Sequence, residues 1–213
     1  MQILALDTAS PFPSVTLLVR EELREESFSQ DRRASEELLP AIERCLAGAG
    51  TTLARCDRIA VCSGPGSFTG LRIGLATAWA LGRAAGVPVE TVSTLEALAE
   101  TARGGPSRVA AVLDAGRGDV VLAVYSLAEG RARLESEPER LPREEGLRRT
   151  ASLETVSSPA DLLGAGAGAA GAPRISPSRA LALAVARAPG EASSSLAGIY
   201  SRPSAAEEKH GAP

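Results

Sequence analysis

Two aspartates stand directly after short apolar runs and are the side chains best placed to hold a ligand. Asp7 follows the run Ile3–Leu6, and Asp114 follows Val109–Leu113. Open α/β sheets gather ligand-binding groups at the carboxyl ends of their strands, so a cleft between these two could hold a metal–nucleotide complex. Thr8 belongs to the same candidate site. The alternative is that each aspartate only stabilises a turn, and the sequence leaves both interpretations open.

A glycine-rich loop, Ser63–Gly74, opens a helical pattern and is a second place for chemistry. Backbone amides at a helix N-terminus can bind an anion. However, Pro65 removes one donor, and Phe68 would crowd a phosphate. The only lysine of the chain is Lys209, so the loop is not a Walker A motif, which needs a lysine directly after its glycines. The glycines could also serve tight turning alone.

The helix that follows the loop is unusually apolar. Between Thr69 and Ala85 it carries only two charges, Arg72 and Arg83, which fall on one narrow stripe at about 100° per residue. The rest forms a bulky ridge and a strip of small residues, namely Leu71, Leu75 and Trp79 for the ridge and Gly70, Gly74, Ala78 and Gly82 for the strip. Such a helix is either sandwiched inside its own domain or covered by a partner. We favour a partner, because two modest lobes have little material to cover it.

Several kinds of chemistry are excluded by what the chain contains. Its only histidine is His210, in a polar tail, which argues against a histidine zinc site and against a Ser-His or Cys-His catalytic pair. Cys45, Cys56 and Cys62 have no CxxC spacing and are expected to be reduced core thiols. With a net charge of −3 and 3% aromatic residues, the chain shows no surface for direct RNA binding.

The start of the chain lacks a basic region and a cleavage site, and no apolar stretch is long enough to span a membrane. We therefore expect a cytoplasmic protein that does not enter the membrane.

Apolar runs and turn residues divide the first half into alternating strands and helices. Strands are predicted at Ile3–Leu6, Ser14–Val19, Ile59–Cys62 and Val87–Val92, with an edge strand around Ser27–Ser29. A helix with one apolar face follows Ser35 and ends at the glycines 48 and 50, and Pro40 lies either in its first turn or at a kink. A further helix, capped by Ser93 or Thr94, runs to about Thr101.

The second half repeats this beginning. After Gly104-Gly105-Pro106, a run ending at Asp114, a tight connector and the run Val120–Tyr125 echo the first two strands. This predicts a duplicated fold with one unit at 1–104 and a smaller one at 105–213. Further on, the pattern predicts a short helix near Arg149, a strand entering a glycine turn at 162–168, a helix at Arg179–Arg187 and a frayed tail from about Ser204.

Six segments together resemble the bacterial TsaB family, also called YeaZ. They are Ile3–Ser10, Leu38–Glu43, Gly64–Gly74, Val92–Leu98, Asp114-Ala115 followed by Gly118-Asp-Val, and Tyr200–Arg202. The likeness runs from residue 1 to about 209, and it is weak between about 128 and 195.

The resemblance implies a two-lobed actin-like ATPase (ASKHA, ribonuclease H-like) α/β fold built from a duplicated ββ(β)αβα unit. It also implies a non-catalytic scaffold subunit for forming N6-threonylcarbamoyladenosine beside the tRNA anticodon. Such a subunit binds and activates the TsaD transferase, together with the ATPase TsaE, and forms a homodimer without TsaD. It touches tRNA only through the complex and has no metal and no cofactor beyond weakly bound adenine nucleotide at a subunit interface.

In this family, both assemblies use the two helices of the first lobe, here residues 36–48 and 70–85. The resemblance carries the interface to Leu38, Leu39, Ile42, Leu46, Gly70, Leu71, Gly74, Leu75, Ala78 and Trp79. Asp7, Thr8 and Asp114 would then be a vestigial nucleotide site. Ala34 is a departure, since many relatives have histidine before the serine at this point.

The runner-up is a kinase-like ATPase that uses Asp7 and Asp114 with magnesium, against which stands the lack of a phosphate-contacting lysine. A peptidase has little support, because Ser67 has no histidine to act as its base.

Overall fold

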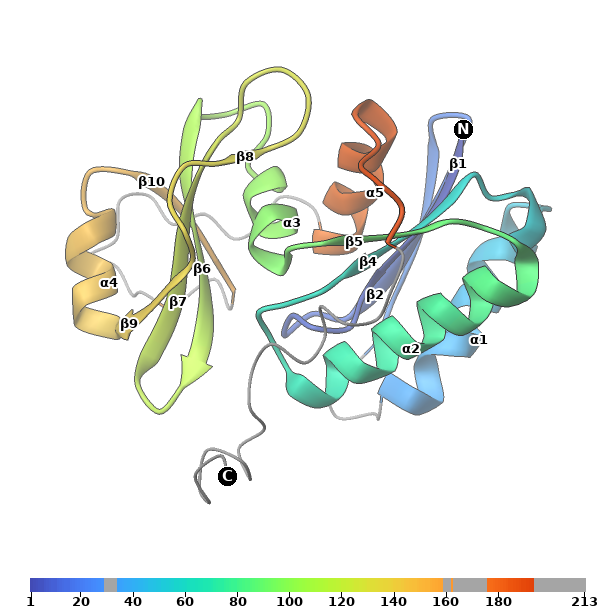
Figure 1. Ribbon diagram of the computed structural model, residues 1–213, viewed down its shortest axis with the longest axis horizontal. Coiled ribbons are helices and arrows are strands. Elements are labelled where there is room, and N and C mark those ends of the chain that lie inside the picture. Colours follow the sequence, from blue (N-terminus) through green and yellow to red (C-terminus); the bar gives the residue numbers. More distant parts are fainter. Residues whose placement is uncertain (29–33, 159–161, 163–175, 194–213) are drawn as a thin grey trace.

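The computed structural model describes residues 1–28, 34–158, 162 and 176–193. It contains two five-stranded sheets that lie side by side, each with helices packed on its faces (Figure 1). The predicted two-lobed α/β fold is confirmed.

The first sheet is built by the strands of the first half. It consists of β1 (Gln2–Asp7), β2 (Ser14–Val19), β3 (Glu22–Ser27), β4 (Arg58–Cys62) and β5 (Val89–Val92), in the order β3-β2-β1-β4-β5. The pairs β1–β2 and β2–β3 are antiparallel, and β1–β4 and β4–β5 are parallel. The central β1 is apolar because both of its faces are covered.

Two helices cover one face of this sheet and a third covers the other. α1 (Ala34–Gly48) and α2 (Phe68–Ala85) pack on the side to which Leu4 and Leu6 point, and a short turn of 3-10 helix, Leu53–Arg55, lies beside them. α5 (Pro177–Arg187) packs on the side of Ile3 and Ala5. The alternation along β1 thus feeds two separate cores.

The second sheet repeats the first. Its strands are β6 (Arg108–Gly116), β7 (Asp119–Ser126), β8 (Arg133–Leu134), β9 (Glu139–Pro142) and β10 (Glu154–Ser158), with the order β10-β6-β7-β8 and β9 also paired with β7. α4 (Arg143–Thr150) joins β9 to β10 as α1 and the 3-10 turn join β3 to β4. β6 pairs antiparallel with β7 and parallel with β10, so the predicted duplication is confirmed.

Each half of the sequence contributes one helix that packs on the sheet formed by the other half. α3 (Thr94–Glu100) follows β5 but packs on the second sheet through Leu95, Leu98 and Ala99. α5 follows the strands of the second sheet but packs on the first. The two helices lie against each other between the sheets (Figure 1). The strands therefore separate near residue 104, whereas the helices cross over.

One local prediction needs correction, because the edge strand lies at Glu22–Ser27 rather than around Ser27–Ser29. Of the two positions left open for Pro40, the structure has the one inside the helix α1. The three cysteines are buried and free, as predicted. The strand and turn expected at 162–168, apart from Leu162, and the tail from Ser204 fall outside the described residues. Within the described part of the chain, no helix is both long and apolar enough to cross a membrane.

Candidate functional site

The carboxylate of Asp7 is enclosed by its own turn. Its side chain is fully buried and accepts hydrogen bonds from the backbone N–H groups of Ala9 at 3.0 Å and Ser10 at 3.1 Å. The Ser10 hydroxyl donates to the other carboxylate oxygen. Burial raises the pKa of Asp7, and the bonds from Ser10 and Ala9 lower it in part. Asp7 therefore has the geometry of a turn-stabilising residue.

The glycine-rich loop is likewise occupied by contacts within the chain. Ser67 N–H donates to the Ala9 carbonyl at 2.9 Å, and Gly64 N–H donates to the Thr94 hydroxyl at 3.1 Å. Gly64 has φ +107°, a conformation that L side chains rarely adopt. Ser67 caps α2 by accepting from Gly70 N–H. These amides point into the fold, so the loop works as a tight turn at this end of α2.

The small-residue strip of α2 faces Thr8 and the first sheet. Thr8 donates its hydroxyl proton to the Gly70 carbonyl at 2.7 Å, and a Cβ at Gly70 would overlap the Thr8 carbonyl oxygen. At Gly74 a Cβ would overlap the Thr8 hydroxyl. The backbone that approaches this strip belongs to the same chain, so the strip packs within the first lobe.

The predicted interface residues divide into an inner and an outer set. Leu38, Ile42, Leu75 and Ala78 are buried in the first core, with Gly70 and Gly74 buried beside Thr8. Leu46, Leu71 and Trp79 are half-buried, and Leu39 is 48% exposed.

Part of the outer surface of α1 and α2 is apolar and could be touched by a partner, and we call this part the α1–α2 face. It consists of exposed Leu39 on α1 and of Phe68, Arg72, Ala76 and Ala80 on α2, whereas Glu36, Glu43 and Arg44 are exposed elsewhere on α1. Phe68 is 41% exposed, and the Arg72 guanidinium lies 5.4 Å from the centre of its ring. The half-buried Trp79 borders this face, and its buried Nε1–H has no hydrogen-bond partner among the residues that the structure describes. The face is apolar, and it carries basic rather than acidic charge along α2.

Asp114 lies in a different setting from Asp7. Its side chain is exposed, and it accepts a hydrogen bond from Gly116 N–H at 2.7 Å within the last residues of β6, next to the turn into β7. Asp7 and Thr8 meet beside the start of α2, but no interaction among the described residues joins Asp114 to them. Nor do three His, Cys, Asp or Glu side chains within the described ranges gather closely enough to hold a metal ion.

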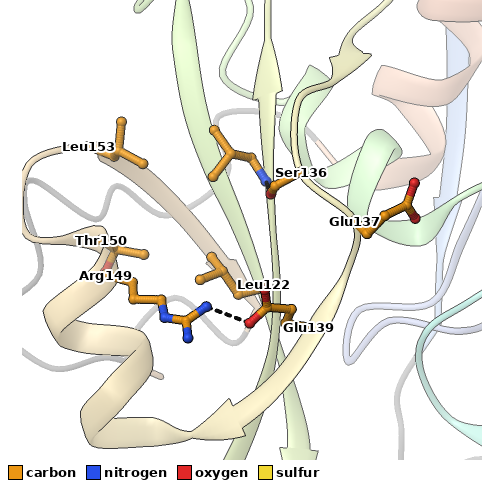
Figure 2. Close-up of a pocket in the computed structure, with 8 residues that line it drawn as sticks. Leu122, Ser136, Glu137, Glu139, Arg149, Thr150 and Leu153 are labelled. Atoms are coloured by element: carbon orange, nitrogen blue, oxygen red, sulfur yellow. Dashed lines mark hydrogen bonds and ion pairs between the residues drawn. The ribbon is translucent and has the colours of Figure 1, made fainter.

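A hollow on the outer side of the second sheet was not predicted from the sequence. It has a volume of about 290 Å³ and lies between β7, the segment that joins β8 to β9, and the end of α4 (Figure 2). Leu122 and Leu153 give it an apolar wall, and an ion pair between Arg149 and Glu139 crosses it. The residues that line it are spread between positions 122 and 153, and their spacing in the sequence matches no motif that would predict a pocket.

These features define a class: a two-lobed α/β protein with related sheets, a sealed turn at the end of its first strand and an apolar helical face. The family model TsaD, described as tRNA N6-adenosine threonylcarbamoyltransferase, matches residues 22–176, and the chain belongs to this family.

Individual relatives point to one branch of the family. The chain is 37% identical over 131 residues to the tRNA threonylcarbamoyladenosine biosynthesis protein TsaB of Escherichia coli, covering 61% of this chain and 57% of that one. For TsaB of Bacillus subtilis, the identity is 31% with the same coverage. The solved structure of YeaZ from Pseudomonas aeruginosa matches with a TM-score of 0.66 and 34% identity, covering 74% of this chain and 75% of that chain. The resemblance to TsaB and YeaZ is thus confirmed. The chain spans less than three fifths of the length of these curated relatives.

Proposed function

We propose that this chain is a non-catalytic scaffold subunit required to form N6-threonylcarbamoyladenosine next to the tRNA anticodon. In this role it binds and activates the TsaD transferase together with TsaE. The names of the Escherichia coli and Bacillus subtilis relatives, both called tRNA threonylcarbamoyladenosine biosynthesis proteins, support the pathway. The family match to TsaD supports a partner of related fold.

The observation that carries the proposal is the exposed apolar α1–α2 face. Leu39 and Phe68 stand on the surface of neighbouring helices, with the alanines 76 and 80 between charged positions. Aromatic and arginine side chains at the centre of a face are the usual anchors of a protein interface, and here they are Phe68 and Arg72. Small alanines along α2 allow a partner helix to come close. We therefore place TsaD, and a second copy of this chain when TsaD is absent, on this face.

The proposal that the chain is no enzyme draws on the sealed site of the first lobe. The Asp7 carboxylate is buried and bonded to Ala9 and Ser10, so a magnesium ion would have to displace those donors. The loop amides of Gly64 and Ser67 are used within the chain. A kinase-like reaction would need both groups free to act. We accordingly propose no resident cofactor or metal, and contact with tRNA only through the complex.

The test uses two matched exposed leucines. Leu39 on α1 is 48% exposed and Leu134 on β8 is 44% exposed, so Leu39→Glu and Leu134→Glu make the same chemical change at equal exposure in different lobes. Leu39→Glu combined with Ala80→Glu should abolish co-elution with TsaD and tRNA modification in a reconstituted mixture, because two carboxylates must then be desolvated at the interface. Leu134→Glu should leave both unchanged.

Circular dichroism must show that the variants are folded. Unchanged co-elution of the folded double variant would reject the α1–α2 face as the binding surface. Full tRNA modification by TsaD and TsaE without this chain would reject the scaffold role itself.

A further inference from the structure

A cluster of charged side chains, two of them almost fully buried, joins the two lobes, and the proposed function makes no use of it. It contains three carboxylates and four guanidinium groups, which we call the junction cluster: Glu90, Glu96, Glu100, Arg58, Arg103, Arg131 and Arg187. The side chain of Glu90 is only 3% exposed and that of Glu100 only 1% exposed. Carboxylates so deeply buried remain charged only when cations and hydrogen-bond donors surround them.

Arg131 connects the first sheet to the second lobe. It lies between β7 and β8, where the neighbouring Ala132 is part of the core of the second sheet. Its guanidinium pairs with Glu90 on β5 of the first sheet and with Glu96 on α3, at 2.9 Å from Nε to Oε1. A single side chain thus spans a strand of one sheet and the helix that covers the other.

Glu100 makes the reciprocal connection from α3. It accepts from Arg103 Nε at 2.6 Å and from the backbone N–H of Ala132 at 2.5 Å, both on the side of the second lobe. It also pairs with Arg187 on α5, the helix that packs on the first sheet. Arg187 in turn donates to the Gly130 carbonyl at 3.3 Å. Arg187 and Arg131 therefore each connect the two lobes.

The chain that leaves α5 is held by the same cluster. Gly190 N–H donates to Glu90 at 3.1 Å, and its carbonyl accepts from Arg58 at 2.8 Å. A Cβ at Gly190 would come within 2.6 Å of a Glu90 oxygen, so the approach tolerates little more than a glycine. Opening the lobes would separate these groups and take cations and donors away from two carboxylates that are almost fully buried, those of Glu90 and Glu100.

From this arrangement we infer that the junction cluster locks the angle between the two lobes, so that the chain works as one rigid body and does not close over a ligand. Two-lobed proteins that act on ligands by hinge closure need a junction of few residues that can change conformation. Here the junction instead contains a network of arginine–carboxylate pairs, of which Arg131–Glu90 and Arg187–Glu100 join the two lobes and would be broken by rotation.

Single-molecule FRET on the full chain tests the lock. Dyes are attached to Ala54→Cys in the first lobe and Ala151→Cys in the second, both exposed positions. The native thiols are buried, and burial raises the pKa of Cys45 and Cys56 to about 11, which keeps them protonated and slow to react. The wild-type chain should give one narrow FRET peak that saturating MgATP does not move.

Arg131→Met should broaden and shift that peak, because Glu90 and Glu96 lose the cation they share. The matched control is Arg149→Met, which removes a guanidinium paired with Glu139 and Glu145 at the surface of the second lobe. It should leave the peak unchanged. If Arg131→Met does not fold, Glu90→Gln with Arg131→Met removes both charges and is expected to broaden the peak.

Two wild-type peaks, or a shift on adding MgATP, would overturn the lock whatever the variants do. A folded Arg131→Met with a wild-type peak would overturn it too. The measurement needs neither TsaD nor tRNA, so its outcome is independent of the proposed scaffold role.

Discussion

The ends of β1 and β6 occupy equivalent places in the two sheets but are built differently. β1 ends in Asp7, which is buried and bonded by Ala9 and Ser10, and the following Thr8 is pressed against α2. β6 ends near Asp114, which is exposed in a tight hairpin. The same strand order therefore supports a tightly packed turn in one lobe and an open turn in the other. Position in a fold alone does not make an aspartate a ligand-binding residue.

The largest difference between the two lobes is expected when one methyl group is added to α2 and, separately, to α4. Gly70→Ala places a Cβ against the Thr8 backbone, which cannot move aside, and should destabilise the chain by about 3 kcal/mol or more. In the second lobe, a Cβ at Gly146 meets the Val120 side chain at 2.8 Å rather than backbone, so Gly146→Ala should cost less, about 1–2 kcal/mol. Urea unfolding measures both, and equal losses would contradict the tighter packing of the first lobe.

A smaller effect should come from the hydroxyl that holds Asp7. Ser10→Ala removes the donor to one oxygen of a buried carboxylate and should cost about 1–3 kcal/mol. Ser136→Ala is the counterpart in the second lobe, where an exposed hydroxyl accepts from Val124 N–H at 3.1 Å and water can take its place. We expect its cost to be below about 1 kcal/mol. A cost for Ser10→Ala as small as that for Ser136→Ala would show that the Asp7 turn is not sealed.

The smallest expected effect is a dependence of stability on pH, which should distinguish the buried Asp7 from the exposed Asp114. Because burial raises the pKa of Asp7 in the folded chain, the folded state holds the proton more tightly than the unfolded state does. Stability due to Asp7 is therefore present at low pH and is lost as the pH rises from the ordinary value of 3.8 through the raised pKa. Asparagine at position 7 does not titrate. The melting temperature of Asp7→Asn relative to that of the wild type should therefore increase as the pH rises.

The control for that experiment is Asp114→Asn in the open turn. Asparagine can still accept from Gly116 N–H, and the side chain is exposed, so stability should stay within about 0.5 kcal/mol of the wild type. A difference in melting temperature between wild type and Asp7→Asn that stays constant from pH 4 to pH 8 would contradict the burial of a titrating carboxyl at the end of β1.

The strands were predictable where apolar runs end at turn residues. The run before Asp7 and its echo before Asp114 gave the duplication, because a short buried strand needs little more than such a run and a following turn. The edge strand at Glu22–Ser27 was misplaced, since it is held by backbone bonds to β2 and its charged side chains report nothing of that pairing.

The candidate site was only half predictable. Helical spacing correctly put Gly70, Gly74 and Ala78 on one side of α2, but spacing does not tell which backbone lies opposite, and here it is that of Thr8. The junction cluster and the hollow beside Arg149 could not be found at all. Their members are brought together by the fold from distant positions, as in the pair of Arg131 with Glu90.

The exchange of α3 and α5 affects how the chain folds during its synthesis. One face of the first sheet is completed only by Leu181 and Val185, which are synthesised long after β1 to β5 have left the ribosome. Until then, Ile3, Ala5 and Ala60 lack the cover that α5 provides and are open to chaperone binding or to aggregation. Fragments cut near residue 104 should for the same reason be insoluble when expressed alone and should recover native structure when they are mixed.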